Sequence, residues 1–433
     1  MVNRPSYSGA PVGGALEGVR VIDLTMMLAG PYASMMLADQ GADVIKVEPP
    51  GGDNTRRIGP HLPGALVQEQ GGYGSYFASI NRNKRSIVLD LKSTAGLAAL
   101  KRMIATSDIL IENFRYGVME RLGLDDATLT DLNPRLVHAS VRGFGDAAGG
   151  VSPYRDWPAY DPVSQAMGGI MGITGPVPGG APTKIGPGIG DIAPAMFAAF
   201  GAVAALYRAQ RTGQGDRVDI SMVDSVLALC ERMIYQYSAT GVSPGPEGNG
   251  HPLLCPFGIF EAADGYLTLG IPNDKFWAIF TDLIGRPELA TDPDFATNPS
   301  RIANATRTMA AVSDWTRART RAQISEVLGG HVPFAPVMTA EDIFSDPHFQ
   351  ARTMLSDVAV PGTGDRLQIA NTPVRMEHAT AGVRTQAPLI DEHAEEILGE
   401  FGFTADDIAA LGPRTKAVQP GADQKYEKEG TMS

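Results

Sequence analysis

A carboxylate at position 191 stands in surroundings that suit covalent chemistry. Three glycines between residues 186 and 190 lead directly into Asp191, and an uncharged apolar stretch follows over residues 193–206. The pattern predicts a glycine loop that delivers Asp191 to the start of a buried helix. A carboxylate nucleophile needs this same setting, in which it is ionised, desolvated on one side and facing an open backbone, although the local pattern alone favours a simpler role. The alternative is a helix N-cap, the usual role of an aspartate just before an apolar helix.

Basic residues form a second group, which suits an anionic ligand: Arg82, Lys84, Arg85, Lys92, Arg115 and Arg121. The first three precede a strand predicted over residues 86–91, and the last two follow a strand predicted over residues 108–112. Loops at strand ends are where α/β folds bind ligands, and Phe114 beside these cations suits a nucleotide that carries phosphates. The alternative is a solvated charged face that holds no ligand.

The elements that must position these residues alternate along the chain. A strand over residues 19–24, a helix over 31–40 and a strand over 43–48 form a β-α-β unit of Rossmann type. The same alternation continues with strands over residues 86–91, 108–112, 133–140 and 217–221 and a helix over 94–105. We therefore expect an α/β fold around a parallel sheet. The turn over residues 25–30 lacks G-x-G-x-x-G, which disfavours a dinucleotide site.

The chain is expected to divide into a large Rossmann-like domain over residues 1–225, a smaller α+β domain over 226–335 and a segment over 336–433 that returns to the large domain. A long helix predicted over residues 223–237 leads into the small domain. A hairpin there has predicted strands over residues 257–261 and 266–270. Residues 1–15 and 414–433 are expected to form a loose arm and a frayed polar tail.

Composition excludes several classes of function. The 433 residues carry a net charge of -12, which argues against non-specific binding to nucleic acid or to an anionic membrane. Only two cysteines occur, so no disulfide framework is implied and a reducing, cytoplasmic setting fits. No signal peptide is recognisable, and no stretch is expected to approach the roughly 20 apolar residues of a membrane span. The seven histidines lack metal-ligand spacing, so no metal site is predicted.

Several stretches together match one family in its own order: LEGVRVIDLT, AGPYASMMLADQGADVIKVEPPGGD, NRNKRSIVLDLK, ENFRYGVMERLGL, NPRLVHASVRGFG, GIGDIAPAMFAAFGAVAALYRAQRTGQGDRVDISMVD, GRPELATDPDFATNPSRIAN and FSDPHFQAR. They run over nearly all of residues 16–400. The chain thereby resembles the family III CoA-transferases, the formyl-CoA and carnitine CoA-transferase group.

The resemblance implies an acyl-CoA:carboxylate CoA-transferase that works through an aspartyl-CoA thioester. Asp191 matches the family's nucleophilic aspartate. The positions that match the lining of the coenzyme A site are Ala29, Leu89, Lys92, Asn113, Phe114 and Arg121. The family fold implies an interlocked homodimer of two chains threaded through each other. The implied substrates are an acyl-CoA and a small carboxylic acid, and neither can be named from the sequence.

Three departures from the family pattern bear on the activity. Leu28 stands where formyl-CoA enzymes carry a glutamine, and the loop over residues 247–251 is less glycine-rich than their mobile lid. The third departure is Tyr160, which stands where the related racemases carry a histidine. Tyr160 and Asp161 fall where formyl-CoA enzymes carry Tyr-Glu, so Asp161 matches their auxiliary carboxylate. The alternatives are a 2-methylacyl-CoA racemase or intramolecular acyl-CoA isomerase of the same superfamily, or a coenzyme A-binding protein without catalysis. Tyr160 disfavours racemisation, because a racemase needs a second acid/base group.

Overall fold

The computed structural model describes residues 13–62, 72–251, 253–361 and 363–412. The chain forms two compact units. Unit 1 comprises residues 1–168, 186–229 and 350–433, and unit 2 comprises residues 169–185 and 230–349. The domain boundaries expected at residues 225 and 335 stay predictions. The expected arm up to residue 12 and the polar tail from residue 413 lie outside the described residues.

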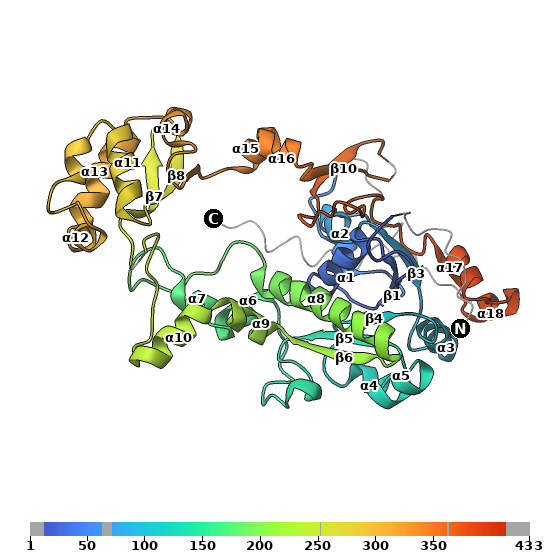
Figure 1. The fold of residues 1–433 in the computed structure, drawn as a ribbon. Coiled ribbons are helices and arrows are strands. Elements are labelled where there is room, and N and C mark those ends of the chain that lie inside the picture. Colours follow the sequence, from blue (N-terminus) through green and yellow to red (C-terminus); the bar gives the residue numbers. More distant parts are fainter. Residues whose placement is uncertain (1–12, 63–71, 252, 362, 413–433) are drawn as a thin grey trace, which may run out of the picture. The chain divides into compact units, whose positions relative to one another are not determined.

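Unit 1 is built on a six-stranded parallel sheet in the order β3-β2-β1-β4-β5-β6 (Figure 1). This is the strand order of doubly wound α/β proteins, so the predicted α/β fold class is confirmed. The strands are β1 (Arg20–Asp23), β2 (Asp43–Glu48), β3 (Lys84–Val88), β4 (Ile109–Glu112), β5 (Val137–Arg142) and β6 (Asp216–Ser221).

The other elements of unit 1 are helices and one hairpin. The helices are α1 (Ala29–Asp39), α2 (Ser75–Ile80), α3 (Thr94–Ile104), α4 (Val118–Arg121), α5 (Asp126–Leu132), α6 (Asp161–Met167), α8 (Ile189–Thr212), α9 (Met222–Leu229), α17 (Ala394–Glu400) and α18 (Ala405–Ala410). The hairpin pairs β10 (Leu355–Ala359) with β11 (Arg366–Ala370) in antiparallel register.

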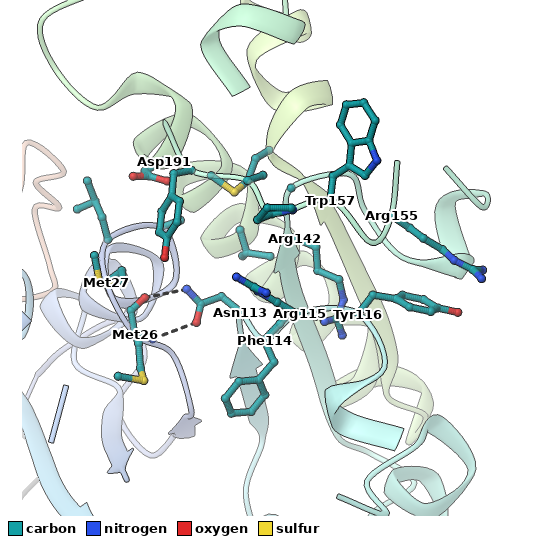
Figure 2. Close-up of a pocket in the computed structure, with 18 of the residues that line it drawn as sticks. Met26, Met27, Asn113, Phe114, Arg115, Tyr116, Arg142, Arg155, Trp157 and Asp191 are labelled. Atoms are coloured by element: carbon teal, nitrogen blue, oxygen red, sulfur yellow. Dashed lines mark hydrogen bonds between the residues drawn. The ribbon is translucent and has the colours of Figure 1, made fainter. Parts of the chain in front are cut away.

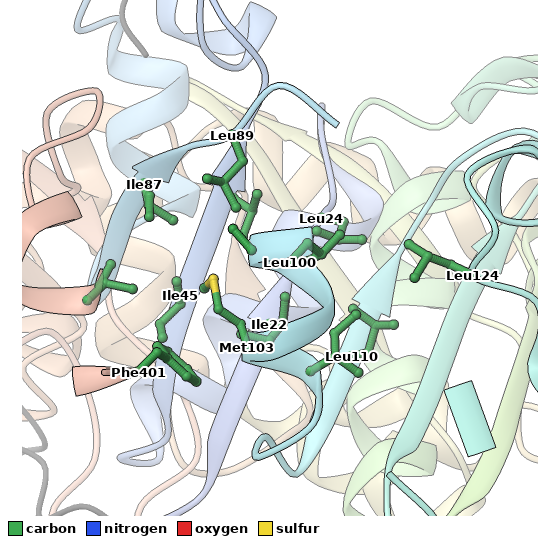
Figure 3. Packing of buried hydrophobic residues seen from close by; sticks show 14 of the residues in the cluster. Ile22, Leu24, Ile45, Ile87, Leu89, Leu100, Met103, Leu110, Leu124 and Phe401 are labelled. Carbon is green, nitrogen blue, oxygen red and sulfur yellow. The ribbon is translucent and has the colours of Figure 1, made fainter. Parts of the chain in front are cut away.

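Alternation along the strands gives the sheet two apolar faces. Ile22, Ile45 and Leu110 lie in one core with Leu100 and Met103 of α3 (Figure 3), and their strand neighbours face the opposite core. That opposite core contains Val21, Val44 and Ile109 together with apolar residues of α1 and α8. Successive strand side chains point to opposite faces, so β-branched runs buried on both sides are the expected sequence signature. Each fully buried Leu or Ile stabilises the fold by about 1.5–3 kcal/mol.

The carboxyl-terminal segment completes the first of these cores. Ile397, Leu398 and Phe401 of the α17 region are buried in the cluster that contains Ile22 and Leu100. Figure 3 shows Phe401 in this cluster. The Arg20 guanidinium, on β1, donates to the Glu400 carboxylate at 2.7 Å. Residues near 400 therefore pack in the same unit as the first strand.

Helix α8 carries the candidate nucleophile and packs on β5 and β6. Small residues allow this close approach: a Cβ on Gly201 would lie 2.7 Å from Cγ1 of Val218. Among the described residues, α8 is one helix long and apolar enough to cross a membrane by length and composition. The expectation that no stretch comes near that length was wrong. Of its most apolar window, 44% lies buried in the structure, and core helices of sheet proteins meet the same test.

Unit 2 contains a three-stranded antiparallel sheet in the order β7-β8-β9. The predicted hairpin is confirmed, since β7 (Phe257–Ala262) pairs with β8 (Gly265–Gly270). The predicted helix over residues 223–237 is instead two helices, because α9 ends at Leu229 and α10 begins at Glu231. The remaining elements are α7 (Ile170–Ile173), α10 (Glu231–Thr240), α11 (Asp274–Leu283), α12 (Asn298–Ala303), α13 (Ala305–Arg317), α14 (Arg321–Leu328), β9 (Phe334–Pro336) and α15 (Ala340–Ser345), with α16 (Pro347–Ala351) crossing the unit boundary.

Candidate active site

The candidate site lies at the carboxyl ends of β1, β4 and β5, beside the start of α8. The turn over residues 26–28 follows β1, residues 113–116 follow β4, and Arg142 ends β5. Strand order reverses between β1 and β4, and doubly wound sheets bind ligands at such a reversal. The topology therefore creates a crevice beside residues that the sequence analysis identified as candidates for a functional site.

A cavity of about 460 Å³ occupies this crevice (Figure 2). Five of the predicted site residues line it: Ala29, Asn113, Phe114, Arg121 and Asp191. Leu28 and Tyr160, two of the three departures from the family pattern, line it as well. Its volume is within the range of small-molecule sites.

The other two predicted residues lie around a neighbouring cavity. Leu89 and Lys92, just beyond β3, line a second space of about 470 Å³. Met26 and Phe114 line both cavities, so the two spaces share a wall. The structure thus collects all seven predicted positions around two adjoining cavities, and their individual roles stay predictions.

Asp191 is not a helix cap. Helix α8 begins at Ile189, its N-cap position is Gly188, and no side chain caps it. Asp191 is the third helical residue, and its own N–H donates to the Gly188 carbonyl at 3.1 Å. The N-cap alternative is therefore wrong. The side chain is left to face the cavity rather than the backbone (Figure 2).

Burial perturbs the Asp191 carboxyl strongly. Desolvation, helped by the nearby charge of Asp161, raises the pKa of Asp191 to about 7. Within the described residues, no hydrogen bond reaches its carboxylate oxygens. Tyr76 of α2 lines the same cavity, and burial together with the charge of Asp191 raises the pKa of its phenol to about 12. Near neutral pH the cavity therefore holds a basic carboxylate and a phenol that keeps its proton.

The glycines before Asp191 differ in how much space surrounds them. A Cβ on Gly190 would lie 2.5 Å from the Asp161 carbonyl oxygen, so only glycine lets α8 pack against α6 there. A Cβ on Gly186 would meet nothing within 4 Å. Gly190 therefore serves the packing of the protein, and only Gly186 fits the predicted open backbone.

Asn113 holds the turn that follows β1. Its Oδ1 accepts the Met26 N–H at 3.0 Å, and its Nδ2 donates to the Met26 carbonyl at 2.8 Å (Figure 2). The next residue, Met27, has a φ of 70°, a left-handed backbone that costs energy in a side-chain-bearing residue. The amide of Asn113 thus fixes a strained turn whose side chains line the cavity.

Arg142 stabilises the loop that follows β4 at the candidate site. Its guanidinium donates to Glu112 at 2.7 Å, to Asp146 at 2.8 Å and to the Phe114 carbonyl at 2.5 Å. These bonds fix the loop after β4, whose residues 113–116 all line the cavity. Sequence reasoning missed Arg142 and Tyr76, because an arginine ending a strand and a tyrosine in a short helix carry no local signal of function.

The basic group divides in two, and half of the prediction was wrong. Arg82, Lys84 and Arg85 are buried and paired with Asp39, Asp23 and Asp43, respectively. They lie before or at the start of β3, at the opposite end of that strand from Leu89 and Lys92. The strand begins at Lys84, two residues earlier than expected, because charged residues conceal a strand in a sequence pattern. These three cations are occupied by internal acids.

The remaining cations, Lys92, Arg115 and Arg121, are exposed. Throughout the part of the chain that the structure describes, none of them forms an ion pair with a protein carboxylate. Arg115 and Arg121 line the first cavity, and Lys92 lines the second. Three free positive charges around two joined cavities suit a ligand with several phosphates. No cluster of three or more potential metal ligands occurs among the described residues.

Proteins of known class are similar to this chain over most of its length. Residues 16–394 match the sequence model of CoA-transferase family III. The chain is 44% identical over 390 residues to the succinyl-CoA:mesaconate CoA-transferase of Haloarcula hispanica, covering 90% of this chain and 97% of that protein. It is 34% identical over 420 residues to the formyl-CoA:oxalate CoA-transferase of Streptomyces avermitilis, covering 92% and 98%. A crystal structure of a CAIB/BAIF family protein from Brucella suis has a TM-score of 0.79 at 35% identity, covering 90% of this chain and 100% of that one.

Proposed function

The chain belongs to CoA-transferase family III and is a CoA-transferase, and we propose that it moves coenzyme A from an acyl-CoA to a free carboxylic acid through Asp191. The observation that carries the proposal is the setting of this carboxylate. It stands in the first turn of α8, faces a cavity of about 460 Å³, and has its pKa raised to about 7 by burial and by Asp161. A raised pKa makes a carboxylate a better nucleophile once it is ionised.

The first half-reaction loads Asp191. A carboxylate oxygen of Asp191 attacks the thioester carbonyl carbon of the donor, the carbon–sulfur bond breaks, and coenzyme A leaves as its thiolate. The thiolate then attacks the side-chain carbonyl of the resulting mixed anhydride. The donor acid leaves as a carboxylate that carries one oxygen from Asp191, and an aspartyl-CoA thioester remains.

The second half-reaction repeats these steps in reverse with the acceptor. A carboxylate oxygen of the acceptor attacks the aspartyl-CoA carbonyl, and the thiolate leaves. The thiolate then attacks the acyl carbon of the acceptor, forms the new thioester and releases the Asp191 carboxylate. No net proton is taken up or lost. The Tyr76 hydroxyl, protonated at any working pH, lines the cavity as a donor for a developing oxyanion.

We assign the two adjoining cavities to the two ends of the acyl-CoA. Leu89, Lys92 and Phe114 line the second cavity, and we place the nucleotide end of the substrate there. Ala29, Asn113, Arg121 and Asp191 line the first cavity, which takes the phosphates and the thioester. Arg121 and Lys92 lack internal ion pairs in the described chain, so they are available to phosphate oxygens.

Small carboxylic acids are the proposed acceptor class. The names of two relatives contain mesaconate and oxalate, which are both small carboxylic acids. Met26, Met27 and Leu28 give one wall of the cavity an apolar surface, which favours an acyl group less polar than formyl. A matrix of acyl-CoA donors against free acids, read by mass spectrometry, identifies the pair.

Asp191→Asn tests the assignment and separates it from racemisation. The variant should lose transfer while keeping affinity for coenzyme A, because the amide cannot form the anhydride. Wild-type enzyme given a 2-methylacyl-CoA in deuterated water should leave the α-carbon unlabelled. Rapid α-exchange without any acceptor acid would instead support a racemase, and normal transfer by Asp191→Asn would refute the mechanism.

We further propose that the enzyme is a homodimer of interlocked chains. A row of large apolar side chains along α8 is exposed in the single chain: Met196, Phe197, Phe200, Val203 and Tyr207. Phe200 is 74% exposed, and a contiguous apolar row of this kind typically marks a protein interface. Unit 1 is completed by residues that return after unit 2, which is the connectivity that threading requires. Light scattering should show a dimer at every dilution, and a stable folded monomer would contradict interlocking.

A further inference from the structure

A buried amide stands one helical turn from the acid beside Asp191. Gln165 and Asp161 are four residues apart on α6, the spacing at which helical side chains meet. The Gln165 side chain is fully buried, and its Nε2 donates to both carboxylate oxygens of Asp161, at 2.9 and 3.1 Å. The same nitrogen lies 3.5 Å from the carbonyl oxygen of Pro187, in the loop that leads into α8.

Asp161 in turn is tied to the backbone that carries the nucleophile. Its Oδ1 accepts the N–H of Gly190 at 2.9 Å, and Gly190 directly precedes Asp191. The contact is tight, because a Cβ on Gly190 would lie 3.0 Å from the Asp161 Cα and closer still to its carbonyl oxygen. A continuous path of contacts therefore runs from Gln165 through Asp161 to the first turn of α8.

We propose that Gln165 is a positioning residue for the transfer reaction: it fixes the Asp161 carboxylate so that this acid both anchors the first turn of α8 and presents its charge to Asp191. The inference deepens the proposed function and rests on Asp191 being the nucleophile. Gln165 touches neither substrate nor reacting atoms in this scheme. It acts on the reaction through its hydrogen bonds to Asp161.

The neutral character of Gln165 matters to this role. A lysine or arginine in its place would satisfy Asp161 and also cancel its charge, which would remove an interaction that helps keep Asp191 basic. An amide satisfies the carboxylate and leaves the charge in place. Burial first, and Asp161 second, raise the pKa of Asp191 to about 7. Tyr76 of α2 also interacts with the charge of Asp191 and is neutral in this range, and the same cavity is lined by the charged residues Arg115, Arg121, Arg142, Arg155 and Asp156 and by Tyr160.

Gln165→Met tests the proposal, because methionine keeps the length of the side chain and removes its donor. We expect single-turnover acylation of Asp191 at saturating acyl-CoA to slow about tenfold or more, with acyl-CoA affinity within about twofold of wild type. The acid limb of the rate profile should also move to lower pH. Without the Gln165 donor the Asp161 carboxylate is no longer held in place beside Asp191, so its charge raises the pKa of Asp191 less.

Two further variants separate the hydrogen bond from packing. Gln165→Glu keeps the shape and shares one proton with Asp161, so it should restore both the donor and the single negative charge. It should acylate faster than Gln165→Met at pH 7, whereas a role in packing alone would favour the apolar side chain. Ser164→Ala is the matched control, since Ser164 is fully buried on the same helix and bonds the Tyr160 carbonyl rather than Asp161.

The outcomes distinguish this inference from the proposed function beneath it. Acylated Asp191 in wild type, with the same rate and acid limb in Gln165→Met, would overturn the role of Gln165 and leave the mechanism intact. If Gln165→Met is unstable, the Gln165→Glu variant decides: acylation and an acid limb like those of wild type support the role, and loss of acylation in a folded protein overturns it. No acylated Asp191 in wild type would overturn both proposals.

Discussion

Asp23 and Asp191 of unit 1 are both shielded from solvent, but their surroundings shift their pKa values in opposite directions. Asp23, at the end of β1, is fully buried, and Lys84, Lys46, Ser34 and Thr25 outweigh the cost of its burial and hold its pKa at about 2. No cation of the described residues offsets the burial of Asp191, and burial together with the charge of Asp161 raises its pKa to about 7. The difference teaches that burial alone does not decide the role of an acid. The partner decides it: a paired carboxylate is structural, and an unpaired one beside a second acid is reactive.

The cations divide in the same way. Lys84 reaches Asp23 at 3.0 Å with no exposed surface on either side chain, and burial lowers the pKa of Lys84 to about 8 against the pull of Asp23. Lys92, eight positions later, is exposed and lines a cavity. Because both lysines lie in one sequence motif, the pattern of residues does not separate them. What distinguishes the two lysines is the buried acid that the fold places beside Lys84.

The largest expected effect comes from breaking the paired region. Lys84→Met leaves Asp23 buried with one cation fewer, and removing one partner of a buried pair costs about 3–5 kcal/mol of unfolding free energy. Lys92→Met, the same change at an exposed position, should shift stability by only about 0.5 kcal/mol or less. Denaturant unfolding of the two variants measures the contrast. Equal losses would show that the two lysines do not differ as the structure indicates.

Substitution of the exposed cations should affect substrate binding strongly, although it affects stability little. Lys92→Ala and Arg121→Ala should each raise the Michaelis constant for acyl-CoA roughly tenfold, because a charge-assisted contact to phosphate is worth about 1.5–3 kcal/mol. Their unfolding should stay near that of wild type. Arg115→Ala, at the cation that lines the first cavity together with Arg121, tests whether the positive charges of this cavity act together. Unchanged affinity in both Lys92→Ala and Arg121→Ala would contradict their assignment to the substrate phosphates.

A smaller effect should appear in the pH dependence of stability. The pKa of Asp191 is higher in the folded chain than its ordinary 3.8, so its contribution is full below about pH 4 and is lost as pH rises through about 7. Asp191→Asn should therefore match wild type near pH 4 and melt at a higher temperature near pH 8. Asp23 has the opposite sign, and its contribution is lost only as pH falls toward 2. A melting difference between Asp191→Asn and wild type that is the same at both pH values would show that Asp191 is not perturbed.

The local sequence pattern predicted the parallel sheet and the candidate nucleophile. It did not predict the role of a side chain where that role depends on a partner distant in the sequence. The parallel sheet followed from β-branched runs such as Val21-Ile22, and Asp191 from its glycines and apolar helix. The burial of Arg82, Lys84 and Arg85 could not be predicted, because their acids lie up to 315 residues away in sequence. Gln165 was missed although its i, i+4 spacing to Asp161 was readable, since that spacing acquires meaning only when Gly190 packs against it.

The central claim, that the Asp191 carboxylate takes part covalently, has a direct test in heavy oxygen. An acceptor acid labelled in both carboxylate oxygens should leave one labelled oxygen in Asp191 after a turnover. Trypsin would release residues 185–208, in which Asp191 is the only acidic residue, and residues 156–184, which contain Asp161, as an internal control. The account predicts a heavier 185–208 peptide and an unchanged 156–184 peptide. Full transfer to the acceptor with an unlabelled 185–208 peptide would contradict it.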